Sequence, residues 1–112
     1  MQTSEPTERR THETVVADLE EIPPGEGRTF AVGGEQIAVF RHRSGKVSAV
    51  QAVCPHAGGP LADGQIDEDV VICPLHLNAF DLATGTSASL EDRLTVHPCR
   101  VEAGRVLVGG TR

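Results

Sequence analysis

The chain has 112 residues and a mass of 11.9 kDa, the size of one small domain. It carries 16 acidic and 10 basic residues, and this net charge of −6 argues against binding to nucleic acid or to an anionic membrane. Three phenylalanines are its only aromatic residues, so the core is thin and would gain from an additional cross-link.

The N-terminal segment is polar and has no apolar run of the kind found in signal peptides. It predicts a disordered tail over residues 1–13, followed by a single domain over residues 14–109. No stretch approaches the roughly 20 apolar residues of a membrane-spanning helix. Three cysteines cannot form a closed set of disulfides, so we expect a cytoplasmic protein whose cysteines serve a metal or catalysis.

Short strand-like runs follow one another through the domain, and 12 glycines and 7 prolines supply turns between them. Residues 28–32 and 36–41 flank Gly33-Gly34, which predicts a hairpin. Further strands are predicted at residues 15–19, 47–51, 70–72, 79–82, 94–101 and 105–108. This spacing predicts an all-β fold, a small antiparallel β-sandwich or barrel.

Two local sequences that begin with Cys-Pro carry the candidate chemistry. The first is Cys54-Pro55-His56, and the second is Cys73-Pro74-Leu75-His76. Each supplies one thiolate and one imidazole, a combination that favours zinc, copper or an iron–sulfur cluster over magnesium or calcium. Proline after each cysteine is typical of a turn.

These paired loops resemble those of the Rieske [2Fe-2S] proteins. The likeness extends from about Val15 to Val108 and includes Pro60-Leu61, Asp63-Gly64 and the run FDLATG at residues 80–85. The resemblance implies a two-loop cluster-binding subdomain, with loops at about 54–61 and 73–78, that holds one [2Fe-2S] cluster. It places Cys54 and Cys73 on one iron and His56 and His76 on the other.

Two departures separate this chain from the Rieske proteins of cytochrome bc complexes. Gly59 and Leu75 stand where that subtype has a disulfide, and Asn78 and Phe80 replace its hydrogen-bonding serine and tyrosine. Leu77 stands where the family commonly has glycine. The chain is therefore similar to soluble Rieske ferredoxins and to the small subunit of NAD(P)H-dependent nitrite reductase.

The resemblance implies a one-electron carrier, an electron-transfer component rather than a stand-alone catalyst. Its expected donor is a flavin-dependent reductase and its acceptor the terminal oxygenase of a ring-hydroxylating dioxygenase system. The alternative is a nitrite reductase small subunit bound to the large subunit, favoured by residues 22–25 and 32–36. An alternative of another class is a metal-stapled interaction module without redox function.

Other interpretations of the same residues carry less weight. The four candidate ligands could form a structural zinc site, and a Cys–His pair could be a nucleophile, although one nucleophile leaves the second pair unexplained. We expect Cys99 to be a structural thiol and His12, His42 and His97 to be surface or strand residues. The acidic groups at residues 20–21, 67–69 and 91–92 are expected in solvated turns.

Overall fold

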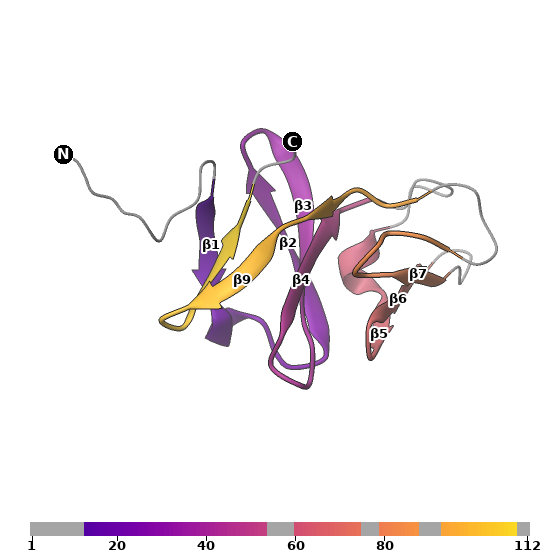
Figure 1. Ribbon diagram of the computed structural model, residues 1–112, viewed down its shortest axis with the longest axis horizontal. Coiled ribbons are helices and arrows are strands. Elements are labelled where there is room, and N and C mark those ends of the chain that lie inside the picture. The colour runs from indigo at the N-terminus through magenta and orange to yellow at the C-terminus, as the bar shows by residue number, and fades with distance from the viewer. Residues whose placement is uncertain (1–12, 54–59, 75–78, 88–92, 110–112) are drawn as a thin grey trace.

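The computed structural model describes residues 13–53, 60–74, 79–87 and 93–109 (Figure 1). The described residues form three antiparallel sheets and two single-turn 3₁₀ helices, η1 (Leu19–Glu21) and η2 (Leu61–Asp63). The predicted all-β, antiparallel fold is therefore confirmed. Residues 1–12 lie outside the described part, so the division into tail and domain remains a prediction.

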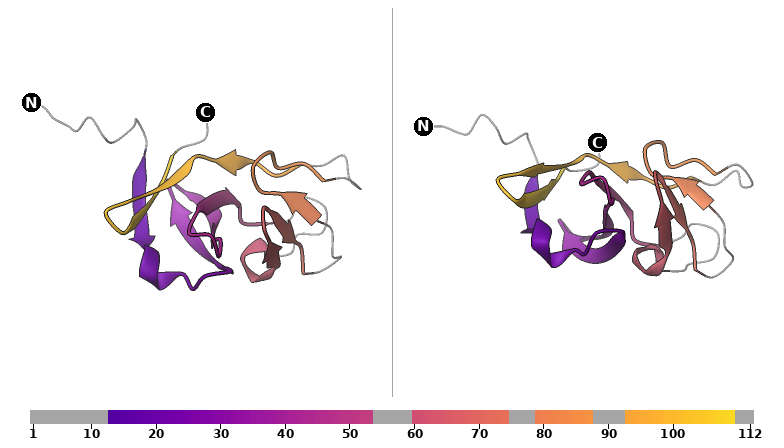
Figure 2. Two further views of the ribbon diagram at one scale, coloured as in Figure 1. Left: turned by 60° about the horizontal axis from the view of Figure 1, so that its bottom comes forward. Right: turned by 90° about the horizontal axis from the view of Figure 1, so that it is seen from below.

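Two sheets form the body of the molecule, and the third lies at one end, away from β1 (Figures 1 and 2). The first sheet has the order β1 (Thr14–Asp18), β10 (Arg105–Val108), β9 (Cys99–Glu102). The second has the order β2 (Glu26–Val32), β3 (Glu35–Arg41), β4 (Val47–Gln51), β8 (Val96–His97). The end sheet has the order β5 (Gln65–Asp67), β6 (Val70–Ile72), β7 (Ala79–Asp81).

The predicted hairpin between β2 and β3 is confirmed. Val32 pairs with Glu35, and the two-residue turn between them places Gly33 and Gly34 at φ of 57° and 87°. Positive φ at both central positions is the geometry that matches the natural twist of paired strands, and glycine adopts it without steric cost.

Strand β3 explains an irregularity of the sequence, in which Ile37 to Phe40 is apolar throughout instead of alternating. Ile37 and Val39 belong to a buried cluster that includes Val106 and Val108 of β10. Ala38 and Phe40 face the other way, into a second buried cluster shared with the end sheet. Both faces of β3 are covered, so a continuous apolar run is what this strand requires.

The predicted single strand over residues 94–101 is wrong. Pro98 divides it into β8, which pairs with β4, and β9, which pairs with β10. Proline has no N–H to give to a ladder, so the interruption falls at a residue that cannot continue the pairing. The chain passes from one sheet to the other at this point.

The start of the described chain is tied to the first sheet. Glu13 accepts two hydrogen bonds from Arg100, from Nε at 2.9 Å and from Nη2 at 3.0 Å.

Within the described ranges, no helix is long and apolar enough to cross a membrane.

Candidate functional site

A single β-bridge joins the two residues that flank the first Cys-Pro segment, residues 54–59. Cys54 and His56 lie outside the described residues, but Val53 and Pro60, which flank the segment 54–59, form an isolated antiparallel bridge. The Leu61 amide donates to the Ala52 carbonyl at 2.9 Å. The two ends of the first segment are thus held side by side.

The second segment begins and ends on a hairpin. Ile72 of β6 pairs with Ala79 of β7, so residues 73–78 connect two paired strands. His76 lies outside the described residues, whereas Cys73 is described and directly follows β6. Of the four predicted ligands, Cys73 is therefore the one whose environment the structure reports.

One buried cluster joins the bases of both segments. Leu61, Cys73 and Phe80 are each fully buried, and they pack in the cluster that also contains Ala38 and Phe40 of β3. Leu61 follows the first segment, while Cys73 opens the second and Phe80 follows it. The core therefore brings together the bases of two loops that are separate in sequence, as a shared metal site requires.

The Cys73 thiol fits the role of a cluster ligand. It is fully buried, forms no disulfide and makes no hydrogen bond to any described residue. A buried sulfur without such a partner, within an apolar cluster, suits coordination of a soft metal centre. With one further thiolate and two imidazoles from the sequence, the donor set matches a [2Fe-2S] cluster held by Cys₂His₂.

Gln51 supports the first segment, and the sequence analysis missed it. Its Nε2 donates to the Val53 carbonyl at 2.7 Å, and its Oε1 accepts from the Thr95 amide at 2.7 Å. One side chain thus connects the residue before Cys54 to Thr95, which directly precedes β8. Glutamine near the end of a strand has no distinctive pattern, so only the tertiary structure reveals this contact.

The FDLATG run begins in β7 and continues into the turn that follows it. Asp81 accepts at Oδ1 from the amides of Ala83 at 2.8 Å and Thr84 at 3.0 Å. Gly85 has φ of 82°, and its carbonyl accepts from the Leu94 amide at 2.8 Å. The motif residues described here therefore shape the backbone that leaves the second segment.

Cys99 belongs to a different core cluster from Cys73. Cys99 is on β9 and packs against the cluster between the two body sheets, where burial raises the pKa of its thiol to about 12. This protonated thiol fits the predicted structural role. His97 is in β8, so the expectation of a strand position is confirmed for it. His42 follows β3 and is buried, so neither a surface nor a strand position is correct for it.

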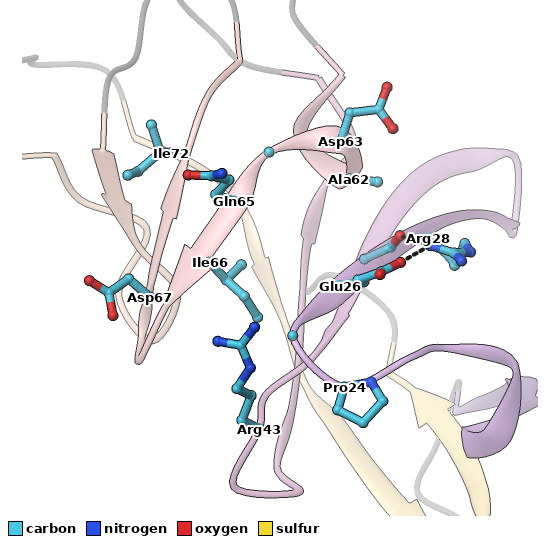
Figure 3. A pocket seen from close by; sticks show the side chains of 13 residues that line it. Pro24, Glu26, Arg28, Arg43, Ala62, Asp63, Gln65, Ile66, Asp67 and Ile72 are labelled. Carbon is cyan, nitrogen blue, oxygen red and sulfur yellow. Dashed lines mark hydrogen bonds and ion pairs between the residues drawn. The ribbon is translucent and has the colours of Figure 1, made fainter.

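A groove of about 700 Å³ lies between the start of β2 and the segment formed by η2 and β5 (Figure 3). Glu26 and Arg28 form an ion pair of 3.2 Å on one wall, and Arg43 extends from the β3–β4 turn toward Ile66. Cys73 is not among the described residues that line this groove. The groove therefore does not include Cys73, the candidate ligand that the structure describes.

Gly64, in the Asp63-Gly64 pair, fits tightly against β6. A Cβ atom at this position would overlap the Ile72 carbonyl oxygen, which belongs to the residue before Cys73. We expect Gly64→Ala to lower the free energy of unfolding by about 1–3 kcal/mol, because backbone must move to accept the methyl group. Chemical denaturation measures this. Gly33→Asn is the control, because no atom lies near a Cβ at Gly33 and asparagine tolerates φ of 57°. An equal decrease in the free energy of unfolding in both variants would contradict the prediction.

Together, the antiparallel body, the end sheet and the paired loop bases define a small all-β domain built to hold a metal cluster. Residues 12–98 match the family model of the Rieske [2Fe-2S] domain. The chain belongs to the Rieske family, whose cofactor is one [2Fe-2S] cluster.

Similar sequences support this assignment. The chain is 34% identical over 102 residues to the biphenyl dioxygenase ferredoxin subunit of Pseudomonas sp. (strain KKS102), covering 88% of this chain and 93% of that one. It is also 43% identical over 67 residues to cholesterol 7-desaturase nvd 1 of Ciona intestinalis, covering 59% of this chain and 14% of that protein. The matched segment thus makes up nearly all of the first relative and a small part of the second.

Two solved structures share the fold closely. The ferredoxin of carbazole 1,9a-dioxygenase from Nocardioides aromaticivorans IC177 has a TM-score of 0.80 and 29% identity, covering 88% of this chain and 98% of that one. A structure described as an NADH-dependent nitrite reductase small subunit from Mycobacterium tuberculosis also has a TM-score of 0.80 and 29% identity, covering 86% and 92%.

Proposed function

We propose that this chain is a one-electron carrier that passes electrons from a flavin-dependent reductase to the terminal oxygenase of a ring-hydroxylating dioxygenase system. The observation that carries the proposal is the buried cluster that joins the bases of both Cys-Pro segments, Cys73 included. The nearly full-length match to a dioxygenase ferredoxin subunit supports the choice of system. A related ferredoxin of the carbazole 1,9a-dioxygenase system has been solved in complex with its oxygenase.

In this proposal Cys54, His56, Cys73 and His76 hold the cluster, which when bound takes up and releases one electron at a time. Cys73 binds as a thiolate, so its proton leaves when the metal binds. The apolar residues around it, Leu61 and Phe80 among them, exclude water from the protein side of the ligand. Gln51 fixes the backbone immediately before Cys54.

The proposal places the carrier in the cytoplasm. Cys73 and Cys99 are both free thiols in the described structure, and they lie in different core clusters. Thiols stay reduced in the cytoplasm, which suits both a cysteine that binds iron and a cysteine that remains unpaired.

The second candidate function is the small subunit of a nitrite reductase. The solved nitrite reductase small subunit has the same TM-score as the carbazole dioxygenase ferredoxin, and this similarity favours keeping the alternative. The two functions differ in how the partner is held. A ferredoxin binds its partners transiently, whereas a subunit stays bound to the large chain.

The salt dependence of electron transfer distinguishes them. The chain has a net charge of −6, so a transient encounter with a basic partner should slow as salt rises, because screening shortens the reach of the field to about 8 Å at physiological ionic strength. We expect the rate of reduction by a flavin-dependent ferredoxin reductase, measured by stopped flow, to fall steadily between low and high salt. A rate that is constant or rises would favour the permanently bound subunit.

A further inference from the structure

A buried histidine connects the body of the protein to the end sheet. His42 follows β3 and is only 3% exposed. Its Nδ1 lies 2.8 Å from the carbonyl oxygen of Glu68, in the β5–β6 turn. Its Nε2 lies 2.7 Å from the hydroxyl of Ser48 on β4. One imidazole therefore contacts both the β3–β4 hairpin and the end sheet.

The partners determine the protonation of each ring nitrogen. A carbonyl oxygen only accepts hydrogen bonds, so Nδ1 carries a proton and donates to Glu68. In the neutral ring Nε2 then accepts from the Ser48 hydroxyl. The two bonds have different roles, because the bond to Ser48 stays within the hairpin and the bond to Glu68 crosses to the end sheet.

The backbone of Glu68, which accepts the hydrogen bond from His42, has an unusual conformation. Glu68 has φ of 59°, in the left-handed region that non-glycine residues seldom occupy. The next residue, Asp69, accepts at its carbonyl from the Leu82 amide at 2.7 Å, directly after β7. The turn that receives the His42 bond is thus linked to both strands that border residues 73–78.

A second link joins the same two turns, but it is exposed. Lys46 Nζ lies 2.6 Å from Asp69 Oδ1, and the two side chains are 54% and 53% exposed. Exposed ion pairs contribute little to stability, since water and salt screen them and both side chains lose freedom. The buried hydrogen bond of His42 is the stronger constraint, because breaking it leaves a polar group without water.

We propose that His42 is a positioning residue, whose Nδ1–H bond to the Glu68 carbonyl holds the end sheet, and with it Cys73, in place on the body of the protein. The proposal goes beyond the function proposed above, since it concerns how the cluster-binding subdomain is held and applies whichever protein accepts the electron.

Two substitutions at position 42 separate the two bonds. The amide of asparagine reaches about as far as Nδ1, whereas the amide of glutamine reaches about as far as Nε2. His42→Asn therefore keeps a donor for Glu68, and His42→Gln keeps a partner only for Ser48.

Hydrogen exchange measured by mass spectrometry on the cluster-containing protein reports the protection of each sheet separately. We expect exchange in β5–β7 to rise on the order of tenfold in the glutamine variant and much less in the asparagine variant, with β2 and β3 unchanged in both.

Two controls keep the test decisive if a variant at position 42 does not fold. Ser48→Ala removes only the bond within the hairpin, and Lys46→Met removes only the exposed ion pair. Both should leave exchange in β5–β7 close to that of the unmodified protein. The proposal is overturned if Ser48→Ala, which leaves the bond to Glu68 in place, raises exchange in β5–β7 on the order of tenfold, whether or not a variant at position 42 folds. It is also overturned if His42→Gln raises exchange equally in every sheet, which would indicate a general loss of stability.

Discussion

Replacing Cys73 with serine is expected to give a folded protein that retains no stable [2Fe-2S] cluster. Serine is similar in size, so the buried cluster around Leu61 and Phe80 should still pack, but a hydroxyl is a poor ligand for this soft metal centre. His76→Ala should likewise lose the cluster or leave it unable to cycle, because one iron loses a ligand. Visible absorption and iron content measure both outcomes.

Cys99→Ser is the matched control for the Cys73 substitution. Cys99 lies on β9 in the other core cluster, and burial raises the pKa of its thiol to about 12, so it is protonated at neutral pH. Its replacement should leave the visible spectrum intact. A protein that loses its colour with Cys99→Ser and keeps it with Cys73→Ser would contradict the ligand assignment.

The reduction potential is expected near the lower end of the Rieske range of roughly −150 to +300 mV. Hydrogen bonds to the cluster sulfurs stabilise the reduced form and so raise the potential. Phe80 has no hydroxyl where the high-potential Rieske proteins have tyrosine, and Asn78 stands in place of their serine. Gly59 and Leu75 replace the cysteines of their disulfide. All three differences lower the expected potential.

The double substitution Asn78→Ser with Phe80→Tyr should therefore raise the potential. Phe80 is fully buried in the same cluster as Cys73, so a hydroxyl on its ring is introduced in the neighbourhood of the candidate site. Phe30→Tyr is the control, since it adds the same hydroxyl on β2 against the other core cluster. Protein-film voltammetry compares the three proteins. A wild-type potential in the upper half of the range would contradict the low-potential interpretation.

Local signals predicted much of the fold. Gly33-Gly34 between two apolar runs predicted the β2–β3 hairpin, because the turn geometry depends on those two residues alone. The break at Pro98 was missed, although proline is a known interruption of strands, because the apolar pattern continues on both sides of it. Which sheet each half joins depends on partners far away in the sequence.

In the candidate site, too, features local in the sequence could be predicted, and contacts between distant residues could not. The spacing of the cysteines and histidines predicted the family, which the family match confirms. These tertiary contacts could not be predicted, because Gln51 accepts from the backbone amide of Thr95 and His42 donates to the backbone carbonyl of Glu68, both distant in sequence. A carbonyl leaves no trace in the sequence of the residue that provides it. His42 was accordingly expected at the surface or in a strand, and its burial became evident only from the end sheet packed against it.

The central claim is that this chain binds a [2Fe-2S] cluster that carries single electrons. The most direct test combines iron and sulfide analysis of the purified protein with a reductive titration followed by visible absorption and electron paramagnetic resonance. We expect two irons and two sulfides per chain, as a [2Fe-2S] centre requires, and visible bands that bleach on uptake of one electron as a paramagnetic signal appears. A colourless protein that holds zinc, or a coloured protein that accepts no electron, would contradict the claim.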